Sequence, residues 1–600
     1  MVPSWKDMAA GGLILALAVA ASAAWSGLGP SPSADVARGT EDAFGRGLHR
    51  RELPPGGAPQ RWTTERASFT FHGLAGAPLA VTVQIRDARG PVAIVSDGVV
   101  LGRVGPGPGT TTVELPRTGR ATREVELWAE PFRAGDGRVL GARLGRVELD
   151  RARSAAPAVP IVLLVLVPAM GVLLAARTAG LGPWAAAAVA AATIAFETAA
   201  LWPSGLSHSP YARRLAILLL AGSLAALAFA RLVGKHEVVT RRAAFVALLA
   251  AWLVQVAAAT SPVMVVSDAV FHANKLAAVA EGDLFPTSVT QHARPFRFPY
   301  GVSFYALLAP LARAGLDTVD LVRGGAALAG LAATAAVFLL GLSCGGPRLG
   351  ALAALLLQLV PGAFDVAYSY GNLSHAFGQA AMVLFFCWWA GRATGGWPAG
   401  ALLLALAMLA HFSTFVFALA LAAALAVAEA RGAEGARTRL VAAGAGILAA
   451  SAYYAHFGGL VWDQLPRLFE GGGQGRGASR SAWDAARLQA SGALAQWGAP
   501  LIALAIVGRP RPEEGSRGQR ALAAYWVAGL ALALPAVFSP FEVRYLYGLT
   551  AALALSGAAG ALRLDAAGGA RRALGVALLV AQAVFAAGGI AHAIVGRYRS

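Results

Sequence analysis

Charged residues are scarce in this 600-residue chain. Asp, Glu, Lys and Arg make up 14% of it and apolar residues 57%, and the mean hydropathy is +0.58. Soluble domains carry roughly 25% charged residues. This balance excludes an ordinary soluble enzyme and predicts an integral membrane protein with many membrane segments.

Cysteine is almost missing as well. The only two, Cys344 and Cys387, lie at or inside apolar segments and lack metal-type spacing, so the sequence predicts neither a disulfide scaffold nor a zinc site. The glycine-rich run at residues 471–477 lacks Walker spacing, and no Rossmann or kinase fingerprint occurs. Nucleotide binding is therefore not supported.

The formal net charge is +18. Its arginines cluster between apolar runs and form no basic face with interleaved aromatic residues, which is the pattern expected of nucleic-acid binding. We therefore attribute the charge to membrane topology and expect no nucleic-acid partner.

Apolar segments recur along most of the chain. A bilayer core needs about 20 apolar residues per helix, and roughly fifteen candidates occur, several of them short or broken. The stretch from Trp397 to Ala430 is either two short helices or one long one. The segments begin near residues 11, 158, 182, 215, 243, 320, 348, 375, 398, 412, 438, 493, 520, 545 and 572. The predicted fold class is mainly α, a polytopic transmembrane helical bundle.

Basic residues in alternate loops predict the orientation. If Lys6 places the N-terminus in the cytoplasm, one consistent register puts the basic loops on the cytoplasmic side. These loops are Arg231 to Arg242, Arg431 to Arg439, Arg509 to Arg520, and Arg563 to Arg572. We expect a multi-pass protein of the cytoplasmic (inner) membrane, and the lipid bilayer is therefore one of its expected partners.

Three regions are predicted. Residues 1–28 are a transmembrane anchor or a cleavable signal, because small residues follow the short apolar stretch. Residues 29–156 are rich in Gly and Pro and alternate apolar with polar residues at 68–72, 79–85 and 110–115, which predicts an extracytoplasmic β-sandwich. Residues 157–600 form the polytopic domain. Within the sandwich, Trp62 or Trp128 would bind a sugar, or each would be an ordinary core residue, the interpretation we favour.

Outer loops at 263–319, 364–374 and 458–492, with a short turn at 539–544, must build any outward-facing site. The first begins directly after an apolar segment and carries Asp268, His272 and Lys275. Asp268 and His272 share a face if this stretch is helical. The alternative for Asp268 is an N-cap, since Ser-Asp before an amphipathic run is a helix-start signal.

These residues carry a resemblance to a family. The boundary acidic residue, Gly282-Asp283-Leu284-Phe285-Pro286, the run from Pro299 to Tyr305 and Leu321-Val322-Arg323 resemble the GT-C superfamily of polytopic glycosyltransferases, which includes protein O-mannosyltransferases and aminoarabinose transferases. The resemblance covers roughly residues 240 to 440, and its motifs are loose. Unlike the usual family pattern, about four segments and a β-insert precede the first matching loop.

The resemblance implies an extracytoplasmic site, a polyprenyl-phosphate-linked sugar donor and a catalytic acidic residue, which falls on Asp268. A second acidic residue in the next outer loop falls on Asp365. A divalent metal, Mg²⁺ or Mn²⁺, shared by Asp268 and Asp365 would suit carboxylates and phosphate oxygens. No other cofactor is expected.

Two further clusters are candidate substrate-binding residues. Asn372 and His375 lie at the polar mouth of a helix and either line a cavity or merely accompany close packing at Gly371 and Gly378. Near the C-terminus, Glu542, Arg544 and Tyr545 are similar to a stretch of lipid-phosphosugar mannosyltransferases, although the His-Lys pair that precedes it there is absent. Arg544 would hold a phosphate through bidentate bonds, or Glu542 and Arg544 would anchor a helix end at the interface.

The hypothesis that follows is a membrane glycosyltransferase. Asp268 would be the general base, and Arg544 with Lys275 or Arg323 would balance the leaving phosphate. The acceptor is a glycan, a lipid or a protein. Alternatives are a transporter or flippase for lipid-linked sugars, and an inactive relative that binds glycans. His411 is interpreted as structural, and Glu197, within an apolar segment, receives no catalytic role.

Overall fold

A computed structural model describes the chain apart from a set of gaps, and its described residues form two compact units. Unit 1 comprises residues 1–245, 256–265 and 594–600, and unit 2 comprises residues 246–255 and 266–593. The gaps are residues 1–3, 50, 53, 55–56, 75–78, 117–119, 136, 152–156, 236, 261–267, 290–296, 365–366, 369–370, 392–395, 430–434, 464–481, 512–516, 537–546 and 600.

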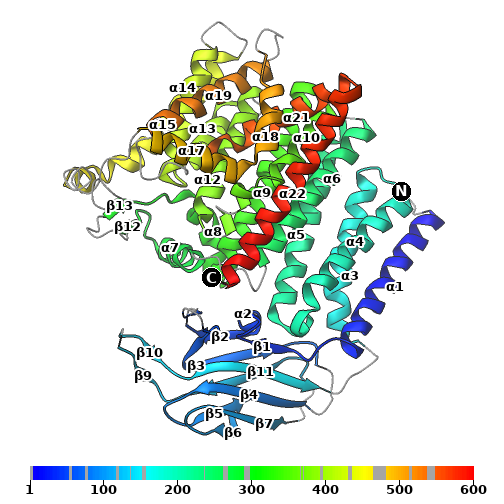
Figure 1. Cartoon of the computed structure of the whole chain (residues 1–600), viewed down its shortest axis with the longest axis vertical. Helices are drawn as coiled ribbons and strands as arrows, with labels where there is room; N and C mark the ends of the chain where they lie inside the picture. Colours follow the sequence, from blue (N-terminus) through cyan, green and yellow to red (C-terminus); the bar gives the residue numbers. More distant parts are fainter. Residues whose placement is uncertain are drawn as a thin grey trace. The chain divides into compact units, whose positions relative to one another are not determined.

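Unit 1 carries an antiparallel β-domain, as the alternating runs predict (Figure 1). Its nine-stranded sheet runs in the order β6-β5-β8-β3-β11-β4-β7, with β1 on β11 and β2 on β3. The strands are β1 (Ser33–Asp35), β2 (Gly45–Leu48), β3 (Arg61–Phe71), β4 (Leu79–Asp87), β5 (Val92–Ser96), β6 (Val99–Val104), β7 (Gly109–Leu115), β8 (Arg123–Trp128) and β11 (Arg143–Arg151), beside a separate pair, β9 (Phe132–Arg133) and β10 (Val139–Leu140).

Alternation of side chains explains the core of this β-domain. Successive residues of a strand point to opposite faces, and the inward residues of β3 and β4, such as Phe69, Val81 and Val83, are completely buried. Trp62 and Trp128 lie on the other face and are half-buried. The expectation that they are core residues is therefore wrong: Arg66 stacks over Trp128 at 4.5 Å, and Phe132 packs edge-on to Trp62 at 5.5 Å.

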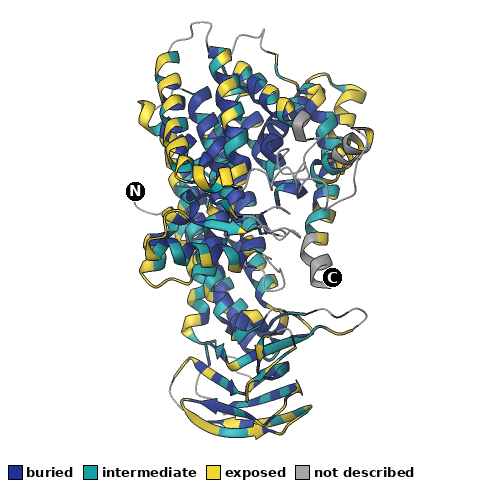
Figure 2. Ribbon diagram, turned by 90° about the vertical axis from the view of Figure 1, so that its left-hand side faces the viewer, coloured by how far each residue is buried: buried dark blue, intermediate teal, exposed yellow. Residues whose placement is uncertain are grey.

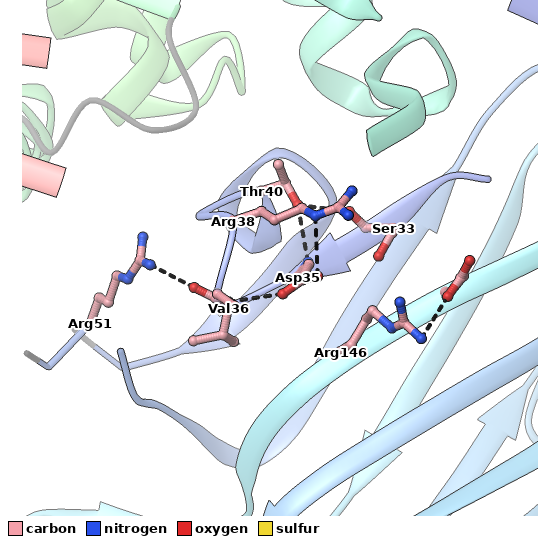
Figure 3. Close-up of polar contacts among 9 residues, drawn as sticks. Ser33, Asp35, Val36, Arg38, Thr40, Arg51 and Arg146 are labelled. Atoms are coloured by element: carbon pink, nitrogen blue, oxygen red, sulfur yellow. Dashed lines mark hydrogen bonds and ion pairs between the residues drawn. The ribbon is translucent and has the colours of Figure 1, made fainter. Parts of the chain in front are cut away.

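Polar contacts fix the turn between β1 and the short helix α2 (Glu41–Phe44). Figure 3 shows Asp35 at its centre: one carboxylate oxygen accepts from the Ala37 amide at 2.8 Å, and the Asp35 amide donates to Thr40 Oγ1 at 3.0 Å. Arg51 donates to the Val36 carbonyl at 2.6 Å. These bonds place Glu41 inside the domain, where it is 1% exposed.

Glu41 makes the β-domain sensitive to pH. Burial, then the nearby Asp42 charge, raises the pKa of Glu41 to about 7 from an ordinary 4.5. Because folding raises this pKa, the protein has its full stability below pH 4.5, where Glu41 is protonated in both the folded and the unfolded state. The free energy of unfolding falls as the pH rises from 4.5 to about 7. Glu41→Gln should therefore be more stable than wild type above pH 7 by about 3 kcal/mol.

Thermal unfolding of the whole protein across pH 4.5 to 8 measures this effect. The exposed Glu65→Gln is the matched control and should follow wild type throughout. If Glu41→Gln and wild type kept a constant difference in melting temperature over this range, the buried carboxyl would not be the cause.

Helices complete unit 1. They are α1 (Trp5–Gly27), α3 (Val159–Thr178), α4 (Pro183–Leu201), α5 (Pro210–Leu232) and the parts of α6 (Val238–Thr260) outside unit 2, with short 3₁₀ turns η1 (Pro203–His208) and η2 (Val233–Lys235). Asp7 of α1 pairs with Arg177 of α3 at 2.8 Å. The β-domain is tied to this bundle because the His72 amide donates to the His208 carbonyl at 2.7 Å.

Unit 2 is helical apart from the two-stranded sheet of β12 (Thr287–Val289) and β13 (Arg297–Pro299) in its described part. Its helices are α7 (Ala269–Glu281), α8 (Ser303–Arg313), α9 (Thr318–Gly345), α10 (Pro347–Gln358), α11 (Pro361–Phe364), α12 (Leu373–Ala390), α13 (Gly396–Met408), α14 (Phe412–Glu429), α15 (Ala436–Ala455), α17 (Ala482–Trp497), α18 (Ala499–Val507), α19 (Arg517–Ala536), η5 (Tyr547–Leu549), α21 (Thr550–Ala566) and α22 (Gly569–Arg599).

A helix matches each of the predicted apolar segments, and the chain is a multi-pass membrane protein. Among the described residues, nine helices are long and apolar enough to cross a membrane, or ten if α17 and α18, bent by 93°, form one broken span. The prediction of fifteen segments thus exceeds the number of full-length spans. The stretch from Trp397 to Ala430 is two helices, and α13 and α10 are too short to cross alone.

The surface of unit 2 fits a lipid environment. Figure 2 shows buried residues inside the helical bundle and exposed ones along its outer helices. Large apolar side chains are among the exposed residues, including Val427 at 73% and Leu448 at 70%. Exposed apolar side chains are expected where helices meet acyl chains.

Candidate functional site

Asp268, the principal predicted residue, lies at the start of α7 with its side chain exposed. It occupies the N-cap position, yet its side chain makes no capping hydrogen bond. Its backbone carbonyl accepts from the His272 amide at 2.9 Å. The capping alternative is therefore not supported, and this carboxylate is not required to satisfy the helix end.

Gly371 packs directly against Asp268. Its φ is +72°, and a Cβ built on it would lie 2.7 Å from the Asp268 backbone nitrogen. Only glycine combines this conformation with so close an approach. The loop before α12 thus supports the position of the Asp268 backbone, which links the first predicted outer loop with the second.

His272 lies behind Asp268 and is 1% exposed. Its Nδ1 shares a 2.6 Å hydrogen bond with the Tyr305 hydroxyl. Burial lowers the pKa of His272 to about 4, opposed by a hydrogen bond with the Gly371 backbone. His272 is therefore neutral at pH 7, and its candidate role in substrate binding stays a prediction.

The rings of Tyr300 and Tyr305 pack beside His272, and together they are called the aromatic wall. Tyr300, which follows β13, lies 6.3 Å from both His272 and Tyr305 between ring centroids, and its hydroxyl is 3.5 Å from Ser374 Oγ. The pKa of Tyr305 is raised, mainly by burial and then by Tyr300 and other neighbours that include Asp268. In the sequence, both tyrosines belong to the run from Pro299 to Tyr305 that carries the family resemblance.

Lys275 and Arg323 are both half-buried. Lys275 Nζ donates to the Thr287 carbonyl at 2.6 Å and so joins α7 to β12. Arg323, on α9, exerts its charge on Tyr368: burial raises the pKa of that phenol and the guanidinium opposes the rise. The Lys275 ammonium therefore bonds to the backbone of β12. The charge of Arg323 acts on Tyr368, in the loop before α12.

Asn372 and His375 open α12, with Asn372 at the N-cap position and His375 buried. Gly378 supports the close-packing interpretation, because a Cβ there would lie 2.6 Å from Thr414 Oγ1. His375 also lies 5.0 Å from His411 and 5.9 Å from Tyr547 between ring centroids. Close packing at Gly378 is therefore present, whereas the residues of this helix that line the cavity described next include Ala376 and Gln379 and not Asn372 or His375.

A cavity of about 90 Å³ lies beside these residues inside unit 2. Its walls come from α6, α9, α10, α12 and η5, and include Gln255, Gln358, Gln379 and Tyr547 among mostly apolar side chains. Gln255 Nε2 donates to Gln358 Oε1 at 2.9 Å, and Gln358 Nε2 donates to Thr334 at 2.8 Å. Glutamine in apolar segments was a signal of this cavity that the sequence analysis did not use.

Four predicted residues, Asp365, Glu542, Arg544 and Tyr545, lie outside the described residues. Among the residues that the structure describes, no group of three or more His, Cys, Asp or Glu side chains is placed to hold a metal ion. Because Asp365 is outside that set, the Mg²⁺ or Mn²⁺ shared with Asp268 stays a prediction.

A partial likeness links the chain to a solved structure. It is the crystal structure of the Archaeoglobus fulgidus oligosaccharyltransferase in complex with zinc and sulfate, matched with 13% identity and a TM-score of 0.34. The match covers 57% of this chain and 53% of that one, so the chain spans about half the length of the match. A likeness at this level establishes neither fold nor function. No protein-family model and no curated protein match the chain.

Proposed function

We propose that this protein is a membrane glycosyltransferase that moves a sugar from a polyprenyl-phosphate donor to an acceptor at the extracytoplasmic face. One observation carries the proposal: Asp268 is an exposed carboxylate at the end of an apolar segment that its helix does not use as a cap. The motif resemblance around it supports the same chemistry. The acceptor is a glycan, a lipid or a protein that presents a hydroxyl.

In this mechanism, Asp268 accepts the proton of the acceptor hydroxyl. The acceptor oxygen then bonds to the anomeric carbon of the sugar, and the bond from that carbon to the phosphate oxygen breaks. Polyprenyl phosphate leaves with the electron pair. Such a base must lie within about 3 Å of the hydroxyl. Arg544, together with Arg323 or a Lys275 released from Thr287, would balance the phosphate charge, and a divalent ion on Asp268 and Asp365 would do the same.

Proteoliposomes separate this proposal from a flippase. The probe is a polyprenyl-phosphate sugar with a fluorescent tag on the sugar, supplied with a hydroxylated acceptor glycan. A transferase releases free polyprenyl phosphate and labels the acceptor. Movement of the intact donor to the opposite leaflet without release would instead establish the transporter alternative.

The proposed orientation predicts that the β-domain is outside. Thr110, in β7, is exposed, and Thr110→Cys should react with a membrane-impermeant maleimide added to intact cells. Cys344→Ser and Cys387→Ser remove the background thiols, and a cysteine at Arg571, in the basic loop, is the matched cytoplasmic control. Labelling of Thr110→Cys only after the membrane is broken would place the β-domain inside.

A further inference from the structure

A chain of hydrogen bonds runs from the cavity to the turn between α13 and α14. Gln379 Nε2 lies 2.6 Å from His375 Nε2, and His375 Nδ1 lies 2.6 Å from Ser413 Oγ. Ser413 Oγ in turn lies 2.7 Å from His411 Nδ1. Gln379 lines the cavity, whereas His411, at the other end, is half-exposed.

The direction of this chain follows from one further bond. The Ser413 amide donates to His411 Nδ1 at 3.2 Å, so this nitrogen is an acceptor and carries no proton. The Ser413 hydroxyl must then donate to His411 Nδ1 and accept from His375 Nδ1–H. His375 Nε2 is consequently an acceptor, and the Gln379 amide group donates to it.

The reverse direction is excluded by the same contacts. If Ser413 donated its hydroxyl hydrogen to His375, no hydrogen would lie between Ser413 Oγ and His411 Nδ1, although these atoms are 2.7 Å apart. Two lone pairs at that distance repel. Each of these contacts has a hydrogen when the proton of neutral His411 lies on Nε2.

The turn that carries His411 is held firmly. Thr414 Oγ1 donates to the carbonyls of Ala407 and His411, both at 2.7 Å. The Tyr300 ring of the aromatic wall lies 6.0 Å from the His411 ring in an edge-on arrangement. His411 therefore borders the group of residues that includes Asp268, His272 and Tyr300.

We propose that His411 is a substrate-binding residue of this outer site and donates through Nε2–H to a phosphate oxygen of the lipid-linked sugar. Ser413, His375 and Gln379 are positioning residues that fix this tautomer. The inference rests on the proposed function for the identity of the ligand, but not for the tautomer. It assigns a role to His411, which the sequence analysis interpreted as structural.

Nitrogen-15 NMR of histidine-labelled protein in nanodiscs tests the tautomer without any substrate. His411 is assigned by its loss in His411→Phe. We expect the Nε2–H form at pH 7 in wild type and in Ser413→Thr, which keeps the hydroxyl, and a change of about tenfold or more in the tautomer ratio in Ser413→Ala. An Nδ1–H form in wild type, or an identical ratio in Ser413→Ala, would overturn the inference.

Donor kinetics test the binding role. His411→Phe should raise KM for the polyprenyl-phosphate sugar about tenfold or more, as expected for a lost hydrogen bond to a charged group. His592→Phe, on an exposed part of α22, is the matched control and should leave KM unchanged. An unchanged KM in His411→Phe would reject the binding role, whereas absence of transfer in wild type would reject the proposed function and leave the NMR result standing.

Discussion

Asp268→Asn should lower the rate of sugar transfer by roughly 100-fold or more. Asparagine keeps the size of the side chain but cannot accept the proton of the acceptor hydroxyl. Because Asp268 makes no side-chain capping bond, the substitution should leave expression and melting temperature unchanged. Release of polyprenyl phosphate from a lipid-phosphosugar in proteoliposomes is the measurement.

Asp365→Asn is the companion variant. If the two carboxylates share a metal, each substitution alone should be severe and the double variant little worse, because the second loss removes an interaction that is already gone. Asp317→Asn, at the N-cap of α9, is the matched control: Asp317 accepts capping bonds from the amides of residues 319 and 320, and because Asn caps a helix about as well as Asp, neither stability nor transfer should change there. Wild-type transfer by the Asp268 variant would refute its assignment as the base.

Gly371→Ala should disable the site through the backbone of Asp268. The added Cβ would lie 2.7 Å from the Asp268 nitrogen, so the start of α7 must move. A misplacement of about 1 Å costs a catalytic group roughly 100-fold in rate, and the left-handed conformation adds a strain of about 1 to 2 kcal/mol. Transfer rate and melting temperature should therefore both fall.

Gly282→Ala separates strain from displacement. Gly282 ends α7 with a φ of +113°, and nothing lies within 4 Å of a Cβ built on it. This control should lose stability but keep its transfer rate. If Gly371→Ala and Gly282→Ala lost stability equally and both kept full activity, contact between Gly371 and Asp268 would have no part in function.

The helices and strands follow closely from sequence patterns. Apolar runs mark the helices, and period-two alternation marks β3, β4 and β7, because each pattern reports the burial of one face. The length of each apolar helix is harder to predict from the sequence. Helices α10 and α13 are apolar but stop after 12 and 13 residues: Gln358, the last residue of α10, joins the glutamine network, and Leu409 and Ala410 form a turn before α14.

The candidate site could be predicted from the sequence only in part, because it depends on contacts between segments that lie far apart along the chain. Asp268 stands out by its position after an apolar run, and in the structure its side chain makes no capping bond to α7. His411 does not stand out in the sequence, since the role proposed for it depends on its hydrogen-bonded neighbours Ser413 and His375. His375 lies 36 residues earlier, on another helix. Pairing of this kind has no local sequence signal.

A structure of the protein in nanodiscs with polyprenyl phosphate bound would test the central claim most directly. We expect the lipid phosphate at the start of α7, near the Asp268 carboxylate and within hydrogen-bond distance of His411 Nε2. A phosphate bound at the opposite ends of the helices, beside the basic loops, with Asp268 in contact only with water, would contradict it.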